Sequence, residues 1–288
     1  MGLAPDEPPA DDRPARTRPK WVPVEEEPTM PTTERSGLAI HYDVEGSGPP
    51  LVLLHGGYTS SELWRLRGWV ESLRDERRLI LVDLRGHGQS DKPHDPAAYR
   101  FSVLASDVLA VLDDLGIASA AVCGFSLGAE AALRLAASHP GRVDAVAAIG
   151  SDPAAVGFAD LPREEADGDA LAQRFERDGM GWLAAKLEAE GRQDAARLMA
   201  QADPLAMAAW LRAWGEDAPL PQRLADLSMA SLFAWGELEV EGWDVPDLPP
   251  GARLVIVPGA DHPGVLERRD VMLPELRATL ASARMATV

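Results

Sequence analysis

The ten residues from Ala121 to Glu130 read AVCGFSLGAE, and they decide the fold that we expect for the chain. An apolar start predicts a short strand, and the small residues at the end lead into a helical pattern. Between them lies Gly124-x-Ser126-x-Gly128. A serine on so tight a strand-to-helix turn has a strained backbone, so the residues two positions away must lack bulk. The pattern therefore predicts a serine hydroxyl that projects clear of a sheet.

Strand and helix patterns alternate on both sides of this stretch. Further strands are predicted at residues 38–44, 51–54, 78–83, 143–149, 230–235 and 253–257. Strict alternation of apolar and polar residues predicts a half-buried antiparallel strand at 38–44. Helices are predicted at 61–74 and from Ser102, as the cap residue, to Gly116. Strands that alternate with helices imply parallel βαβ units, which indicates an α/β fold.

The alternation stops between Asp152 and about residue 224, where we find only helical patterns. We expect a helical cap at 152–224, inserted between two parts of an α/β core at 35–151 and 225–288. Residues 1–34 hold eight prolines among mixed charges. Such a segment has little to bury, so we expect a disordered tail there.

Composition narrows the classes of partner and the compartment. The chain has 46 acidic and 28 basic residues, a formal charge of −18, which disfavours nucleic acid and anionic membranes as partners. Its one cysteine, Cys123, excludes an internal disulfide and is typical of a reducing compartment. We find neither an apolar run of membrane-spanning length nor the apolar centre of a signal peptide. We therefore expect a cytoplasmic protein of undetermined oligomeric state.

A serine hydroxyl becomes a good nucleophile when a base accepts its proton and an acid orients that base. Loops at the carboxyl ends of parallel strands converge on one crevice, so the partners are expected there. His262 follows the last predicted strand, and we predict that it is the base. We expect His41 and His94 at the surface, and His55 and His87 in loops whose shape they maintain.

The acid is less narrowly determined. Glu239 lies three residues beyond Gly236, at the expected reach from the strand end, and we predict that it orients the histidine. Asp152 is the competing carboxylate, and Glu237 and Asp244 are weaker candidates.

The oxyanion that forms during acyl transfer needs backbone donors that are already in place. We predict the N–H groups of Gly57 and Leu127 for this role, because both lie at turns next to the crevice. Within the expected cap, Trp182, Trp210 and Trp214 offer large apolar surfaces, and ligand sites are mostly apolar. We therefore expect these tryptophans to line a substrate pocket.

From about residue 36 to 286 the chain resembles the α/β-hydrolase superfamily. The resemblance rests on the motifs His55-Gly56-Gly57, the loop at 83–90, the Gly124–Gly128 turn, Trp235-Gly236-x-x-Glu239 and Gly259-Ala260-Asp261-His262. It implies a mostly parallel eight-stranded sheet with a helical cap, and a triad of Ser126, His262 and an acid.

Two departures from the family pattern stand out. The acid, usually aspartate, is Glu239 here, and the stretch from it to His262 is short. Tyr58 stands where many relatives have proline, which suggests that Tyr58 lines the pocket. The serine at position 126 separates the chain from the dehalogenase and epoxide-hydrolase branches, whose equivalent turns carry aspartate.

These features lead to the hypothesis of a serine hydrolase that cleaves an apolar ester or lactone through an acyl-serine intermediate, without cofactor or metal. The acidic balance argues against anionic substrates, through unfavourable steering. The same residues would also suit a carbon–carbon bond hydrolase, a cofactor-free perhydrolase or haloperoxidase-like enzyme, or biosynthetic acyl transfer or cyclisation. A non-catalytic small-molecule binder is the alternative outside enzymes.

Overall fold

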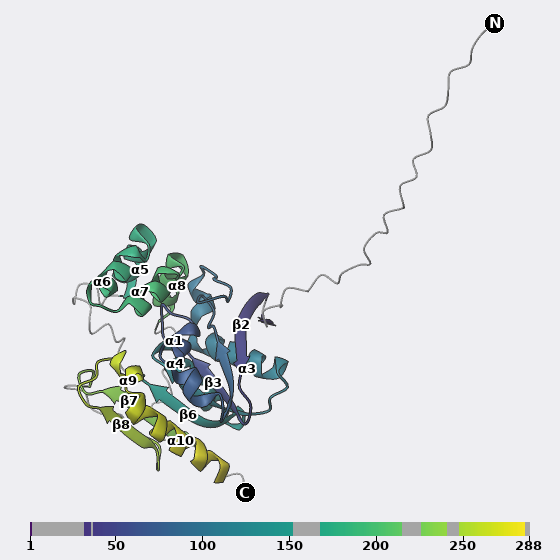
Figure 1. Cartoon of the computed structure of the whole chain (residues 1–288), viewed down its shortest axis with the longest axis vertical. Helices are drawn as coiled ribbons and strands as arrows, with labels where there is room; N and C mark the ends of the chain where they lie inside the picture. The colour runs from purple at the N-terminus through teal and green to yellow at the C-terminus, as the bar shows by residue number, and fades with distance from the viewer. Residues whose placement is uncertain (2–31, 36, 152–167, 215–225, 241–247, 286–288) are drawn as a thin grey trace.

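The computed structural model describes residues 1, 32–35, 37–151, 168–214, 226–240 and 248–285. A sheet of eight strands forms its centre (Figure 1), in the order β1-β2-β4-β3-β5-β6-β7-β8. The strands span Thr32–Arg35 (β1), Leu38–Glu45 (β2), Pro50–Leu54 (β3), Arg78–Val82 (β4), Ala120–Phe125 (β5), Val143–Ile149 (β6), Ala230–Gly236 (β7) and Arg253–Val257 (β8). Strand β2 pairs antiparallel with β1 and β4, and the other pairs are parallel. The predicted α/β class and mostly parallel eight-stranded sheet are confirmed.

The first strand corrects the expected end of the N-terminal tail. Residues 32–34 fall in the range 1–34 for which we predicted disorder, yet β1 pairs with β2 in register, Thr33 opposite Ile40. The four residues of β1 show no apolar alternation, and all but Thr33 are exposed. Their order comes from backbone hydrogen bonds to β2, a tertiary contact that side-chain patterns do not report.

Helices cover both faces of the sheet. Alternate residues of β3 enter two separate cores, because successive strand side chains point to opposite faces. One core includes Val52 and the helices α3 (Phe101–Asp114) and α4 (Leu127–Ser138). The other includes Leu51 with α1 (Glu62–Leu66), α2 (Trp69–Leu73) and α10 (Arg269–Met285). Short helices lie at Pro96–Tyr99 (η1), Pro140–Arg142 (η2) and Gly264–Glu267 (α9).

Two helix predictions need correction. The single helix expected at 61–74 is broken into α1 and α2 because Gly68 has a left-handed backbone, φ 68°. Helix α3 begins at Phe101 and has no side-chain cap hydrogen bond, so Ser102 lies inside the helix and does not cap it. Within the ranges given above, we find no helix with the length and apolar character needed to cross a membrane.

The described residues between β6 and β7 form four helices, which gather as a group of their own (Figure 1). They are α5 (Gly168–Asp178), α6 (Gly181–Ala189), α7 (Gln193–Ala200) and α8 (Pro204–Ala213), and we call them the cap. Asp203 starts α8 by accepting the N–H groups of Leu205 and Ala206, with Pro204 in the first turn. Residues 152–167 and 215–225 lie outside the described residues, so the cap boundaries at 152 and 224 stay predictions.

Candidate active site

Ser126 lies on a strained turn between β5 and α4. Its φ is 51°, a left-handed value that residues other than glycine seldom adopt. A Cβ on Gly124 would come within 2.1 Å of the carbonyl oxygen of Gly128, and one on Gly128 within 2.2 Å of that of Leu54. Both positions must therefore be glycine for the turn to close. The N–H of Ser126 donates to Ile149 at 2.8 Å, which anchors the turn to β6.

His262 and Glu239 meet directly although 23 residues separate them. The Nδ1 of His262 lies 2.5 Å from Oε1 of Glu239, while Oε2 accepts the N–H of Gly236 at 3.2 Å. A carboxylate only accepts hydrogen bonds, so Nδ1 donates and Nε2 is left as the acceptor. The Glu239 side chain is 6% exposed and that of His262 is 28% exposed. The imidazole is thus held in one tautomer with an edge still accessible.

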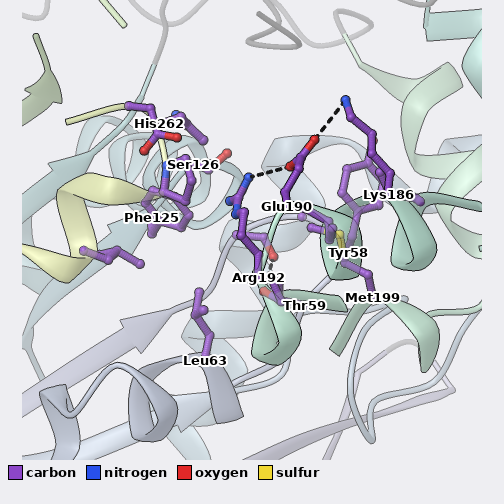
Figure 2. Close-up of a pocket in the computed structure, with 18 of the residues that line it drawn as sticks. Tyr58, Thr59, Leu63, Phe125, Ser126, Lys186, Glu190, Arg192, Met199 and His262 are labelled. Carbon is purple, nitrogen blue, oxygen red and sulfur yellow. Dashed lines mark hydrogen bonds and ion pairs between the residues drawn. The ribbon is translucent and has the colours of Figure 1, made fainter. Parts of the chain in front are cut away.

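The ring of His262 packs against residues next to Ser126. Its centroid lies 4.9 Å from that of Phe125, and a Cβ on Gly150 would come within 2.8 Å of its Cε1. Ser126 and His262 line the same cavity and lie at the same end of it in Figure 2. The structure therefore brings three sequence-predicted residues, Ser126, His262 and Glu239, to one place.

The other candidate acids are placed differently. Glu237 accepts the N–H of Gly259 at 2.8 Å through an exposed side chain, so it supports the loop before His262. Asp152 and Asp244 lie outside the described residues. Glu239 is therefore the carboxylate that the described residues place on the histidine.

The turn after β3 is held by two donors on one oxygen. The carbonyl of Gly56 accepts hydrogen bonds from Nδ1 of His55 and Oγ1 of Thr59, both at 2.8 Å. Nε2 of His55 accepts the N–H of Leu84 at 3.1 Å, which leaves Nδ1 with the proton. A trans peptide is planar, so fixing this oxygen directs the N–H of Gly57 to the opposite side. Thr59 was not predicted from the sequence, in which its signal is a hydroxyl three residues after Gly56.

Leu127, the second predicted donor, is the first residue of α4. The first N–H groups of a helix have no partner inside it, so this group is available to a ligand. Gly57 lines the cavity and packs so closely on Trp210 that a Cβ would come within 2.6 Å of the indole ring. Of the two predicted backbone donors, Leu127 therefore directly follows Ser126, and Gly57 lines the same cavity as Ser126.

A buried polar cluster supports the loop after β4. Asp83 accepts hydrogen bonds from Nδ1 of His41 and from the N–H groups of Ser61 and Gln89. Burial raises the pKa of Asp83, but these donors and the nearby His55 outweigh it and hold the pKa well below its usual range. The expectation of a surface position for His41 was wrong: it is 1% exposed, because it pairs with Asp83.

His87 is unsuited to proton transfer. Burial, assisted by the neighbouring His55, lowers the pKa of His87 to about 3, so the ring stays neutral. Its Nδ1 donates to the carbonyl of Arg85 at 3.0 Å. His87 therefore maintains the loop in which we expected it.

The cavity has a volume of about 680 Å³ and lies between the cap and the carboxyl ends of the strands. Tyr58, Trp182, Trp210 and Trp214, which we predicted to line a substrate pocket, all line this cavity. The Tyr58 ring lies edge-on to Trp210, with centroids 5.2 Å apart, and Trp210 is likewise edge-on to Trp214 at 5.4 Å. Tyr58 has φ 62°, so this turn is strained as well.

The lining also includes charged residues that sequence analysis did not single out: Arg67, Lys186, Glu190, Arg192 and Asp261. Figure 2 labels Lys186, Glu190 and Arg192, and Glu190 lies between the other two. Among the residues that the structure describes, no group of His, Cys, Asp and Glu side chains is arranged to hold a metal ion.

A family model described as "alpha/beta hydrolase fold" matches residues 49–237. A pimeloyl-[acyl-carrier protein] methyl ester esterase of Nitrosomonas europaea is 36% identical over 166 residues, 56% of this chain and 62% of that protein. Epoxide hydrolase 4 of Mus musculus is 36% identical over 109 residues, 36% of this chain and 29% of the mouse protein. Each match spans less than two thirds of the relative's length.

Among solved structures, the enol-lactonase from Burkholderia xenovorans LB400 superposes with a TM-score of 0.72 at 25% identity. The match covers 87% of this chain and 100% of the enol-lactonase. An esterase, an epoxide hydrolase and a lactonase thus share this scaffold, so the substrate has to be argued from the site.

Proposed function

Because this chain belongs to the alpha/beta-hydrolase family, we propose that it cleaves a carboxylic ester or lactone through an acyl-serine intermediate. The observation that carries the proposal is the contact between Nδ1 of His262 and the Glu239 carboxylate. The same histidine lines a cavity together with Ser126. A carboxylate on Nδ1 keeps Nε2 free to accept a proton from a serine hydroxyl.

In the proposed reaction Oγ of Ser126 attacks the carbonyl carbon while Nε2 of His262 takes the hydroxyl proton. The oxyanion accepts hydrogen bonds from the N–H groups of Gly57 and Leu127, and one such donor is worth about 3–4 kcal/mol. When the tetrahedral intermediate collapses, His262 returns the proton to the leaving alkoxide. Water, deprotonated by the same imidazole, then releases the acid and regenerates the serine.

Carbonyl substrates fit this nucleophile better than epoxides do. Opening an epoxide with a serine hydroxyl would leave an ether, which has no carbonyl for water to attack, so the enzyme would be trapped after one turnover. An acyl-serine has that carbonyl, and the proposed Gly57 and Leu127 donors would act again on its oxyanion. The aromatic lining from Tyr58, Trp210 and Trp214 supports an apolar acyl or alcohol portion.

Hydrolysis of p-nitrophenyl acetate and butyrate tests the proposal, with Ser126→Ala as the variant and Ser138→Ala as a control on the exposed end of the same helix. We expect turnover to disappear in S126A alone. A fluorophosphonate probe should label the wild type and S138A, but not S126A, because only an activated serine reacts. Equal turnover in wild type and S126A would exclude the acyl-serine mechanism.

Product analysis separates hydrolysis from the other reactions that this chemistry allows. Free acid and alcohol would support hydrolysis, whereas transfer to an added alcohol or an internal ring closure would support acyl transfer or cyclisation. A folded wild type that resists the probe would instead support the non-catalytic binder.

A further inference from the structure

One side of the cavity carries charge contributed by the corner between α6 and α7. Lys186 lies in the last turn of α6, Glu190 follows that helix, and Arg192 precedes α7. All three line the cavity with Ser126, and in Figure 2 Arg192 lies between Glu190 and Ser126. Two cations therefore adjoin one carboxylate here, in a chain whose overall formal charge is −18. The summed charge of these three side chains is positive, opposite in sign to that of the whole protein.

The other charged groups of the lining have close partners. Arg67 forms an ion pair with Glu267 at 2.9 Å, and Asp261 accepts the N–H of Gly264 at 2.8 Å. Glu239 is engaged by His262. These three groups therefore have close partners in the described part of the chain, and the remaining arginine of the lining, Arg192, is the cation that we consider for a ligand.

The backbone holds Arg192 in position. Helix α6 ends at Ala189, and Gly191 beyond it has the left-handed conformation, φ 80°. The N–H of Arg192 donates to the carbonyl of Leu187 at 2.8 Å. The N–H of Gly191 donates to Glu188 at 3.0 Å, which completes a Schellman motif. The carbonyl of Arg192 then accepts the N–H of Ala196 and begins α7. Arg192 is thus anchored from both sides, and its guanidinium is directed from a rigid corner.

The described partner of this guanidinium is a loose one. Nη1 of Arg192 lies 3.9 Å from Oε2 of Glu190, and Nζ of Lys186 lies 3.9 Å from Oε1 of the same carboxylate. Both distances exceed hydrogen-bond range, and contacts of this kind contribute little. A ligand carboxylate could instead accept two parallel N–H bonds from the planar guanidinium, a far stronger arrangement.

We propose that the substrate is an ester or lactone with a second, anionic group, a carboxylate, which Arg192 binds while the ester carbonyl lies at Ser126. This inference rests on the proposed hydrolase function and defines its substrate class. Lys186 adds positive charge beside the carboxylate, and Glu190 opposes it. Arg192 is a specificity residue here and takes no part in the proton transfers.

The proposal replaces the expectation that anionic substrates are disfavoured. That expectation came from the net charge, but surface charges are screened over about 8 Å at physiological ionic strength. A cation inside the cavity acts at contact distance with little intervening water, so its effect on a bound carboxylate exceeds that of the distant surface. The aromatic walls then contact the chain that joins the two carboxyl groups.

Matched esters of two dicarboxylic acids test the proposal on the full-length protein. The monomethyl esters of glutarate and adipate carry the free carboxylate, and the dimethyl esters lack it. We expect wild-type kcat/KM to be about tenfold or more higher for the monoesters. Arg192→Gln should remove this preference by lowering kcat/KM for the monoesters about tenfold more than for the diesters. Glu190→Gln should increase the preference, because it removes the competing carboxylate.

An inhibition experiment gives the same answer without a variant. Adipate should inhibit wild-type hydrolysis of p-nitrophenyl butyrate competitively and about tenfold or more better than adipamide, which has the same shape without charge. Equal inhibition by adipate and adipamide would overturn the inference. So would wild-type kcat/KM values that are no higher for the monoesters than for the diesters, with Arg192→Gln changing both alike. Either result would leave the hydrolase function standing. Failure of every ester together with an unlabelled Ser126 would instead remove the hydrolase function itself.

Discussion

Replacing Glu239 with glutamine probes the contact on which the proposed chemistry depends. The two carboxylate oxygens serve different donors, Nδ1 of His262 at 2.5 Å and the N–H of Gly236 at 3.2 Å. Glutamine has one oxygen for these two donors. If that oxygen faces Gly236, the amide NH₂ faces Nδ1, which must then accept, and the ring proton moves to Nε2. That tautomer cannot take a proton from Ser126.

The alternative orientation of the amide is no better. With its oxygen on His262, the NH₂ group opposes the N–H of Gly236, and an unsatisfied buried donor costs about 1–3 kcal/mol. The productive tautomer is therefore the minor one, and the negative charge that stabilises the imidazolium is lost in either case. The corresponding aspartate-to-asparagine change in a serine protease lowers kcat by about 10⁴. We expect a loss of about 10³ to 10⁴ in kcat here, which is about 4–5.5 kcal/mol.

The assay is steady-state hydrolysis of p-nitrophenyl butyrate, with the rate of fluorophosphonate labelling as a second readout and the melting temperature as a check on folding. Glu237→Gln is the matched control, since Glu237 lies two residues away and accepts a backbone N–H at an exposed site. We expect that control to keep nearly full activity. A folded E239Q enzyme with kcat within about tenfold of wild type would refute the reasoning.

Three further changes test other parts of the site. Thr59→Val removes one of the two donors on the Gly56 carbonyl and should lower kcat about three- to tenfold with little change in KM; an unchanged kcat would mean that the other donor suffices. Gly128→Ala puts a Cβ 2.2 Å from a backbone oxygen of β3 and should abolish soluble folding, whereas Gly141→Ala, with no atom within 4 Å, should melt like wild type. Burial lowers the pKa of His87 to about 3, so the folded ring stays neutral while the unfolded chain takes up a proton below about pH 6.5. The free energy of unfolding should therefore fall as the pH decreases from about 6.5 toward 3, by up to about 1.4 kcal/mol per unit, and denaturant titrations of His87→Gln should show a shallower fall than wild type.

Much of the fold was predictable from the sequence because its signals are local. The strands β2 to β8 each show apolar runs or alternation within a few residues. The helix break at Gly68 and the strand β1 were not predicted, for opposite reasons. The left-handed backbone of Gly68 divides a region whose apolar pattern is continuous with one helix. Strand β1 has no apolar pattern and is ordered by its pairing with β2.

The candidate site divides in the same way. Ser126 was found from the two glycines beside it, because steric demands on a turn act over two residues. His262 was found from its place after the last strand. His41 was misplaced because only the folded chain brings it to Asp83, 42 residues away.

By itself the sequence located strands β2 to β8 and the turn at Ser126, because hydrophobic period and local sterics act along the chain. Tertiary structure alone decided which carboxylate meets His262 and that Arg192 faces the cavity. Net charge is a sum over all residues, and motif spacing gives only their order along the chain, so neither says where a side chain lies in space. Hydrogen bonds and ion pairs depend on distances of a few ångströms between segments far apart in sequence. Those distances exist only after the cap and the sheet have packed together.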